Sequence, residues 1–107
     1  MISLDLSGND LTGTIPASIG NLTSLYYLKL NQNRLSGYIP SSLSSLTYYV
    51  DLSNNQLIGT IPKSFENLVA YWIDLTNNRM IGTIPNISLL DSNLATIAYQ
   101  EDNLPAY

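Results

Sequence analysis

The stretch VDLSNNQLIGTIP, from Val50 to Pro62, has three near-copies in this chain of 107 residues. They are LDLSGNDLTGTIP (residues 4–16), LKLNQNRLSGYIP (residues 28–40) and IDLTNNRMIGTIP (residues 73–85). Successive copies are offset by 24, 22 and 23 residues, counted between the asparagines Asn9, Asn33, Asn55 and Asn78. A period of this length predicts a solenoid in which each coil contacts only its neighbours.

Apolar residues alternate before each of these asparagines, as Leu28 and Leu30 do before Asn33. This alternation predicts a short strand with one face turned inward. Because the strand recurs once per coil in the same direction, the strands must pair in parallel. The fold class is therefore a repeat solenoid of the α/β type.

The asparagine follows the strand at a point where the chain turns while buried. Its side-chain amide can satisfy backbone groups that the turn leaves unpaired. We therefore expect a structural ladder of amides along the solenoid, made by Asn9, Asn33, Asn55 and Asn78.

A glycine and an Ile-Pro pair close each copy, and an arc follows. Proline stops continuation into a regular helix, and inward-facing residues three apart suit a short 3₁₀ turn. The expected inward pairs are Ile19 and Leu22, Leu43 and Leu46, and Phe65 and Leu68, with serines such as Ser41, Ser42, Ser44 and Ser45 facing water.

The chain is expected to form one domain, residues 1–107, of about four and a half repeats. Their bounds are 1–24, 25–46, 47–69, 70–93 and a partial 94–107. The third and fourth repeats are shortened and carry Thr47 and Ala70 where the leading leucine belongs. An irregularity of the superhelix is therefore expected near residue 50.

Composition excludes several kinds of site. The chain has no cysteine and no histidine, which removes disulfides, thiolate metal sites and the commonest general base. Its net charge of −4 argues against nucleic acid as a partner. No apolar run is long enough to span a membrane, and residues 1–10 do not resemble a signal peptide. We expect no metal and no cofactor.

These residues resemble the plant-type extracellular leucine-rich repeat family, whose pattern is LxxLxLxxNxLxGxIP. The resemblance implies a right-handed superhelix with a concave parallel sheet, convex arcs of 3₁₀ or irregular structure, and a short extra strand around Thr14, Tyr38, Thr60 and Thr83. It also implies an extracellular or cell-surface protein, such as a receptor ectodomain, a receptor-like protein or a secreted inhibitor. The cysteine-bearing caps usual in that family are absent from this chain. We therefore interpret it as an uncapped fragment with missing flanking repeats.

Two columns of side chains should line the concave face. The first column contains Ser3, Tyr27, Tyr49, Trp72 and Thr96, and the second contains Asp5, Lys29, Asp51, Asp74 and Ala98. Aromatic side chains supply large contact area at low entropic cost, so the three rings are the best candidate for binding a partner. The alternative is that the rings only stack and stiffen the sheet.

Charges in the second column should interact. Lys29 can pair with the carboxylates on either side of it, whereas Asp51 and Asp74 are adjacent like charges that call for compensation by Arg34, Arg79 or a cation. The predicted partner-binding residues on the concave face are Tyr27, Lys29, Arg34, Tyr49, Asp51, Trp72, Asp74 and Arg79. Two carboxylates about 5 Å apart could also serve a retaining glycosidase. With no cleft and no other catalytic group evident, the sequence favours non-catalytic recognition of a protein or peptide.

Three other features carry alternatives. Asn21-Leu22-Thr23 and Asn86-Ile87-Ser88 match the N-glycosylation motif. Thr14, Thr60 and Thr83 could form an ice-binding row, which Tyr38 interrupts. Apolar residues at the two ends, Ile2, Leu4 and Leu6 at one and Ile97, Tyr99 and Leu104 at the other, could support end-to-end self-association in a structural or assembly role.

Overall fold

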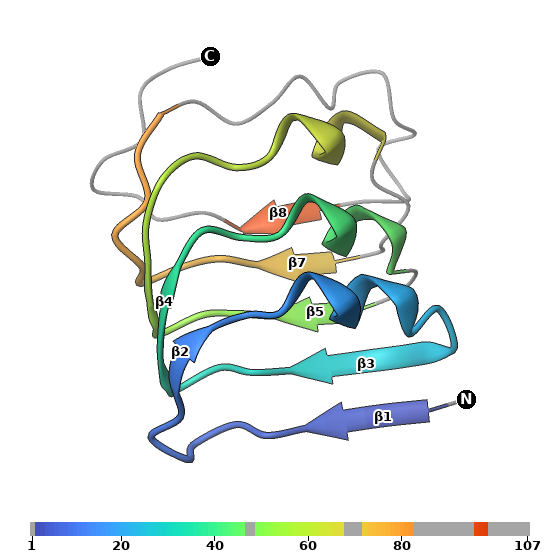
Figure 1. Cartoon of the computed structure of the whole chain (residues 1–107), viewed down its shortest axis with the longest axis horizontal. Helices are drawn as coiled ribbons and strands as arrows, with labels where there is room; N and C mark the ends of the chain where they lie inside the picture. The colour runs from blue at the N-terminus through green and yellow to red at the C-terminus, as the bar shows by residue number, and fades with distance from the viewer. Residues whose placement is uncertain (1, 47–48, 68–71, 83–95, 99–107) are drawn as a thin grey trace.

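The computed structural model describes residues 2–46, 49–67, 72–82 and 96–98, which wind into a solenoid (Figure 1). The larger sheet is parallel throughout, and its strands lie side by side in chain order. They are β1 (Ile2–Asp5), β3 (Leu25–Lys29), β5 (Tyr49–Asp51), β7 (Trp72–Asp74) and β8 (Thr96–Ala98). This arrangement confirms the predicted solenoid with one parallel strand per coil.

A second parallel sheet lies along the side of the solenoid that the chain reaches after each ladder asparagine. This side is here called the flank. It contains β2 (Thr12–Thr14), β4 (Arg34–Gly37) and β6 (Gln56–Leu57). The expected extra strand therefore exists, but it begins and ends earlier than predicted, so Tyr38 and Thr60 follow their strands. The pairing is also staggered, since Gly13 lies opposite Leu35 rather than opposite the equivalent Gly37. Thr83 lies outside the described residues.

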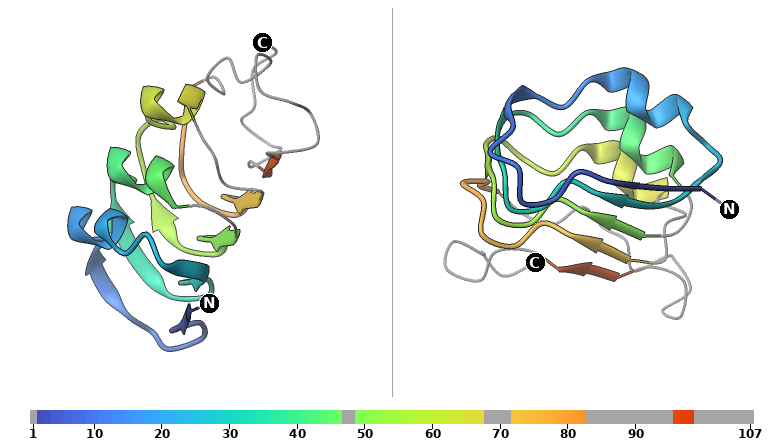
Figure 2. Two further views of the ribbon diagram at one scale, coloured as in Figure 1. Left: turned by 90° about the vertical axis from the view of Figure 1, so that its right-hand side faces the viewer. Right: turned by 90° about the horizontal axis from the view of Figure 1, so that it is seen from below.

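Each of the three described arcs contains one 3₁₀ turn, as the spacing predicts. The turns are η1 (Ala17–Asn21), η2 (Ser41–Ser45) and η3 (Lys63–Asn67). Pro16 and Pro40 precede the first two with extended backbone angles. Figure 2 shows the turns on the outer side of the solenoid and the strands of the larger sheet on the inner side. None of the helical turns in the described ranges is long and apolar enough to cross a membrane.

The interior is a continuous apolar column between the sheets and the arcs. Leu28, Val50 and Ile73 lie opposite one another in the sheet and are buried. The buried set is Ile15, Leu25, Leu28, Leu30, Leu35, Ile39, Leu43, Leu46, Val50, Leu52, Leu57, Ile61, Phe65, Ile73, Leu75 and Met80. The repeating apolar positions therefore specify the core.

The first coil departs from this pattern. Ile2, Leu6, Leu11 and Leu22 stay exposed, with 53%, 39%, 36% and 46% of their surface accessible. Leu22 is therefore exposed, although it lines a hollow together with Leu4 and Leu25 at the first coil. Its counterpart Leu46, which lies between two other coils, is 1% exposed.

The serines of the arcs do more than face water. The Ser42 hydroxyl donates to the Ala17 carbonyl at 2.6 Å, and the Ser64 hydroxyl donates to the Ser41 carbonyl at 2.9 Å. These bonds join each arc to the preceding one. The arcs also approach closely, because a Cβ on Gly20 would lie 2.5 Å from the Ser42 carbonyl oxygen.

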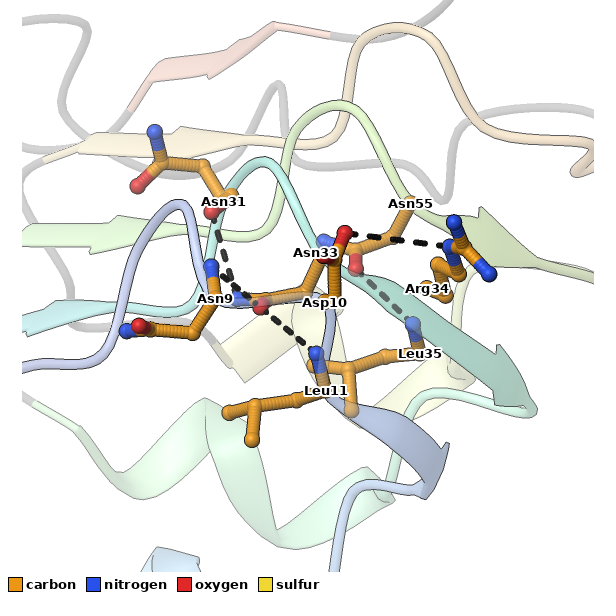
Figure 3. A network of polar contacts seen from close by, with 8 residues as sticks. All are labelled: Asn9, Asp10, Leu11, Asn31, Asn33, Arg34, Leu35 and Asn55. Atoms are coloured by element: carbon orange, nitrogen blue, oxygen red, sulfur yellow. Dashed lines mark hydrogen bonds and ion pairs between the residues drawn. The ribbon is translucent and has the colours of Figure 1, made fainter.

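The asparagine ladder is present and crosses the first three junctions between coils. Figure 3 shows the first two of these junctions. The Asn33 side-chain oxygen accepts from the backbone N–H groups of Asn9 and Leu11, both at 2.9 Å. Its amide nitrogen donates to the carbonyls of Leu6 and Leu30, at 3.0 and 3.1 Å. One side chain thus bonds to two coils.

The side chains of Asn55 and Asn78 also bond to two coils, whereas that of Asn9 does not. The Asn55 oxygen accepts from Leu35, and the Asn78 oxygen accepts from Leu57, both at 3.0 Å. The Asn9 side chain donates only to carbonyls of its own coil, at Leu6 and Ser7, and it is exposed. Asn33 and Asn55 are each 8% exposed, so their bonds are the ones that water cannot readily replace.

We predict that Asn55→Ala lowers the free energy of unfolding by about 1–3 kcal/mol, because it leaves buried backbone groups of two coils unpaired. Urea denaturation monitored by circular dichroism measures this loss. Asn9→Ala is the matched control, since its bonds are exposed and lie within one coil, and it should cost less than about 1 kcal/mol. Equal losses in the two variants would contradict the inter-coil role.

Candidate functional site

The candidate site is the concave face of the larger sheet, the face turned away from the core, where two columns of residues run across the coils. Ser3, Tyr27, Tyr49, Trp72 and Thr96 occupy matching positions in the pairing of β1, β3, β5, β7 and β8. The same pairing aligns Asp5, Lys29, Asp51, Asp74 and Ala98. Both predicted columns therefore exist in the predicted register. The shortened approach to β5 does not interrupt them, although Thr47 and Ala70 lie outside the described residues.

Two rings of the aromatic column, those of Tyr27 and Tyr49, are in contact. The ring centres of Tyr27 and Tyr49 are 5.5 Å apart, with an angle of 55° between the planes. Tyr26 lies edge-on against Tyr27, with ring centres 5.0 Å apart. Tyr27, Tyr49 and Trp72 are each half-buried, so part of each ring is accessible. Pairs in this geometry fix ring orientation, which suits both stacking within the sheet and binding of a partner.

Three carboxylates of the second column are held by the residue two positions later. Asp51 accepts from both the backbone N–H and the hydroxyl of Ser53, at 3.0 and 2.6 Å. Asp74 does the same with Thr76, at 3.0 and 2.7 Å, and Asp5 with Ser7, at 3.0 and 2.6 Å. These local bonds tie each carboxylate to the turn that follows its strand. They lower the pKa of Asp5, since hydrogen bonds from Ser7 favour its charged form.

Lys29 replaces an aspartate in this column but forms no ion pair with either neighbour. The one salt bridge among the described residues joins other groups, so the predicted pairing of Lys29 with the carboxylates beside it is wrong at contact distance. Its ammonium lies 6.0 Å from the centre of the Tyr27 ring, within the range of a cation–π interaction. Lys29 therefore occupies the charged column and interacts with a ring of the aromatic column.

Arg34 and Arg79 do not lie on the concave sheet, contrary to the sequence-based prediction. Arg34 opens β4 on the flank, and its side chain pairs with Asp10 at 3.8 Å, with both groups largely exposed. The Arg79 backbone N–H donates to the carbonyl of Leu57 in β6. The chain turns at the asparagine, so the residue after it belongs to the flank. Neither arginine compensates the charges of Asp51 and Asp74 from the concave side.

The column of acids changes the chemistry of Tyr49. Its pKa is raised above the usual 10.0, first by desolvation and then by the charges of Asp51 and Asp74. A raised pKa means that the neutral phenol is favoured beside two carboxylates. The concave surface at β5 and β7 is therefore negative in potential.

At the β1–β3 end, the concave face is hollowed. A cavity of about 140 Å³ is lined by Ser3, Leu4, Asp5, Tyr27 and Lys29. It combines an anion, a cation and an aromatic ring within two coils. Nowhere in the described part of the chain do three acidic side chains converge to hold a metal ion.

Sequence reasoning missed the roles of Ser7, Ser53 and Thr76, although a signal was present. The triplet Asp-Leu-Ser or Asp-Leu-Thr occurs in the first, third and fourth coils, where the hydroxyl follows the aspartate by two residues. It also missed Tyr26, for which the sequence offers no repeating pattern. Of the predicted glycosylation sites, Asn21 is exposed, and Asn86 lies outside the described residues.

Comparisons with known proteins match this geometry. The family model for the Leucine Rich Repeat matches residues 1–22, 24–46 and 48–68. Receptor-like protein 32 from Arabidopsis thaliana is 54% identical over 44 residues, which is 40% of this chain and 5% of that protein. This chain thus spans a small part of that relative.

Two solved structures extend the match over most of the chain. The crystal structure of PEPR1-AtPEP1 has a TM-score of 0.82 and 38% identity, covering 95% of this chain and 15% of that one. The plant peptide hormone receptor RGFR1 in complex with RGF2 has a TM-score of 0.57 and 30% identity, covering 91% and 20%.

We predict that Asp51→Asn moves the pKa of Tyr49 down toward 10.0, because it removes the largest charge effect and leaves the desolvation. Nuclear magnetic resonance titration of ¹³C-labelled tyrosine rings measures the change. In the parent protein the raised pKa contributes stability that is present below pH 10 and is lost as the pH rises through the folded value. Asp10→Asn, on the flank, should leave the Tyr49 titration unchanged. If both variants shift it equally, the carboxylates of the column are not the cause.

Proposed function

The chain belongs to the Leucine Rich Repeat family, and on that premise we propose that it recognises a protein or peptide ligand through the concave face. The single observation that carries this proposal is the unbroken column Tyr27–Tyr49–Trp72 beside the charged column Lys29–Asp51–Asp74. One similar structure is a plant peptide hormone receptor in complex with RGF2, which supports a peptide as the ligand class.

The two columns suit a ligand in extended conformation that lies across the strands. Strands of one sheet are about 4.8 Å apart, so ring and carboxylate positions repeat at that interval. The half-buried rings supply apolar contact, and the carboxylates of Asp51 and Asp74 supply acceptors for basic or N–H groups. Lys29 and the hollow beside it offer a cation for an acidic group at the other end of the ligand.

We propose that this activity lies outside the cell, and the kind of relatives supports it. They are plant receptor-like proteins and receptor kinases, and this chain would act as the same kind of ligand-binding repeat segment at the cell surface. The described coils hold no constellation for catalysis beyond the carboxylates of the column, each of which is bound to its own turn. Binding without chemistry is the function that this surface supports best.

End-to-end packing is the second candidate, and the exposed apolar residues of the first coil favour it. A hollow of about 460 Å³ opens there, lined by Ile2, Ser3, Leu4, Asn21, Leu22, Thr23, Ser24 and Leu25. Association in light scattering at rising concentration separates this candidate from recognition by a monomer. The ice-binding alternative has less support, because Tyr38 stands between Thr14 and Thr60 and covers Gly59 rather than continuing a flat row.

Peptides that bind the purified chain can be selected from a random phage-displayed library. We expect Trp72→Ala to weaken their binding about 30-fold, because removal of a hot-spot aromatic side chain costs about 2 kcal/mol of binding free energy. Titration calorimetry with synthetic copies of the selected peptides measures the loss. Tyr38→Ala is the matched control, since it removes a 70% exposed aromatic from the flank and should leave affinity unchanged. Peptides that depend on Tyr38 and ignore both Trp72 and Tyr49 would overturn the proposal.

A further inference from the structure

Lys29 is the one cation in the described part of the charged column on the concave face. Its neighbours in that column are Asp5 on β1 and Asp51 on β5. Each of these carboxylates accepts two hydrogen bonds from the turn that follows its own strand. Among the described residues no carboxylate lies within ion-pair distance of the Lys29 ammonium, so its three N–H donors can serve a ligand.

The hollow of about 140 Å³ at Lys29 lies between β1 and β3, which are side by side in the larger sheet (Figure 1). Ser3 also lines this hollow and carries a hydroxyl that can donate. A carboxylate accepts from ammonium and hydroxyl donors, so an acidic side chain suits this chemistry. Asp5 lines the hollow as well and would repel such a group, so binding of an acid there depends on Lys29.

The charge of the column reverses at the next two strands. Asp51 and Asp74 lie opposite each other in the pairing of β5 and β7. The hydrogen bonds that each carboxylate accepts from its turn end on one oxygen, Oδ1. The other oxygen, Oδ2, accepts no bond from a described residue, so the two carboxylates can share one ammonium or guanidinium group of a ligand.

We infer that the concave face binds an extended peptide in one charge order, with an acidic side chain at the Lys29 hollow and a basic side chain at Asp51 and Asp74. This inference rests on the proposed function and names the class of peptide within it. The aromatic column runs beside both places, so its rings would contact the residues between the two charges.

The distance between the two places sets the spacing of the charges in the peptide. The hollow lies between β1 and β3 and the carboxylate pair spans β5 and β7, so their centres are two strand spacings, about 9.6 Å, apart. Polyproline II advances about 9.3 Å in a turn of three residues, which returns the side chain to the same face. A β-strand covers a similar distance in three residues but turns that side chain to the opposite face. The acid and the base should therefore be three positions apart in a polyproline II segment.

Selection of a random phage-displayed peptide library on the full purified chain tests this charge order. The parent should enrich peptides with an acid and a base three positions apart, and Lys29→Asp should enrich peptides that lack the acid. Aspartate occupies the same position in three other coils, so this variant suits the fold. Lys63→Asp is the matched control, since it makes the same charge change at the exposed start of η3 and should leave the enriched pattern unchanged.

Titration calorimetry with one enriched peptide and a copy in which the acid and the base are exchanged measures the size of the effect. The parent should prefer the enriched peptide by about tenfold, because the exchange places like charges together. The preference should shrink in about 1 M salt, which screens exposed charges. Both Lys29→Asp and Lys29→Gln should abolish it, and the second variant does so without adding a negative charge.

An enriched set without this pair of charges overturns the inference, and so does a charge spacing other than three positions. A preference that both Lys29 variants leave unchanged also overturns it. In each case, peptides whose binding still depends on Trp72 would leave recognition by the concave face standing. Loss of that dependence would instead remove the proposed function itself, so the two failures are distinguishable.

Discussion

The amide of one asparagine per coil is the interaction on which the rest of the structure depends. An amide presents a donor and an acceptor on one short arm, which lets Asn33 accept from Leu11 in the coil before it and donate to Leu30 in its own coil. A carboxylate could not donate to carbonyls, and a hydroxyl could not reach both coils. The same bonds set the distance and the register between coils. The columns on the concave face are aligned because this register repeats.

The turn at the asparagine also decides which residues leave the concave face. Gln32, Asn54 and Asn77 precede the ladder asparagine and have φ of 57°, 58° and 58°. These left-handed angles bend the chain from the larger sheet to the flank. Arg34 and Arg79 follow the bend, which is why counting along the repeat misplaces them while it places Tyr49 and Asp51 correctly. Glutamine is less suited to this conformation than asparagine, so this turn is more strained in the second coil than in the third and fourth.

Periodicity was enough to predict the coil, its core and the two columns, because the spacing of the repeat alone places each residue in the core or on the concave face. Hydrogen bonds between nearby side chains were harder to predict, since each depends on the residue types at two positions at once. The hydroxyl at Ser53 matters only because Asp51 stands two residues before it. The approach of Gly20 to Ser42 depends on how two arcs pack, and no repeat pattern reports it.

The second coil breaks the Asp-Leu-Ser rule at both of its variable positions, with Lys29 and Asn31. A lysine there could not accept the two bonds that an aspartate takes from its turn, and Asn31 brings an oxygen that is buried and unpaired in the described structure. Such an unpaired acceptor costs free energy unless something else offsets it. Lys29 instead lies against Tyr27 and beside Asp5, at the hollow of the concave face. The coil that gives up its structural carboxylate is thus the coil that creates a cationic place on an otherwise acidic column. Ligand recognition by the concave face, as proposed above, would make use of that exchange.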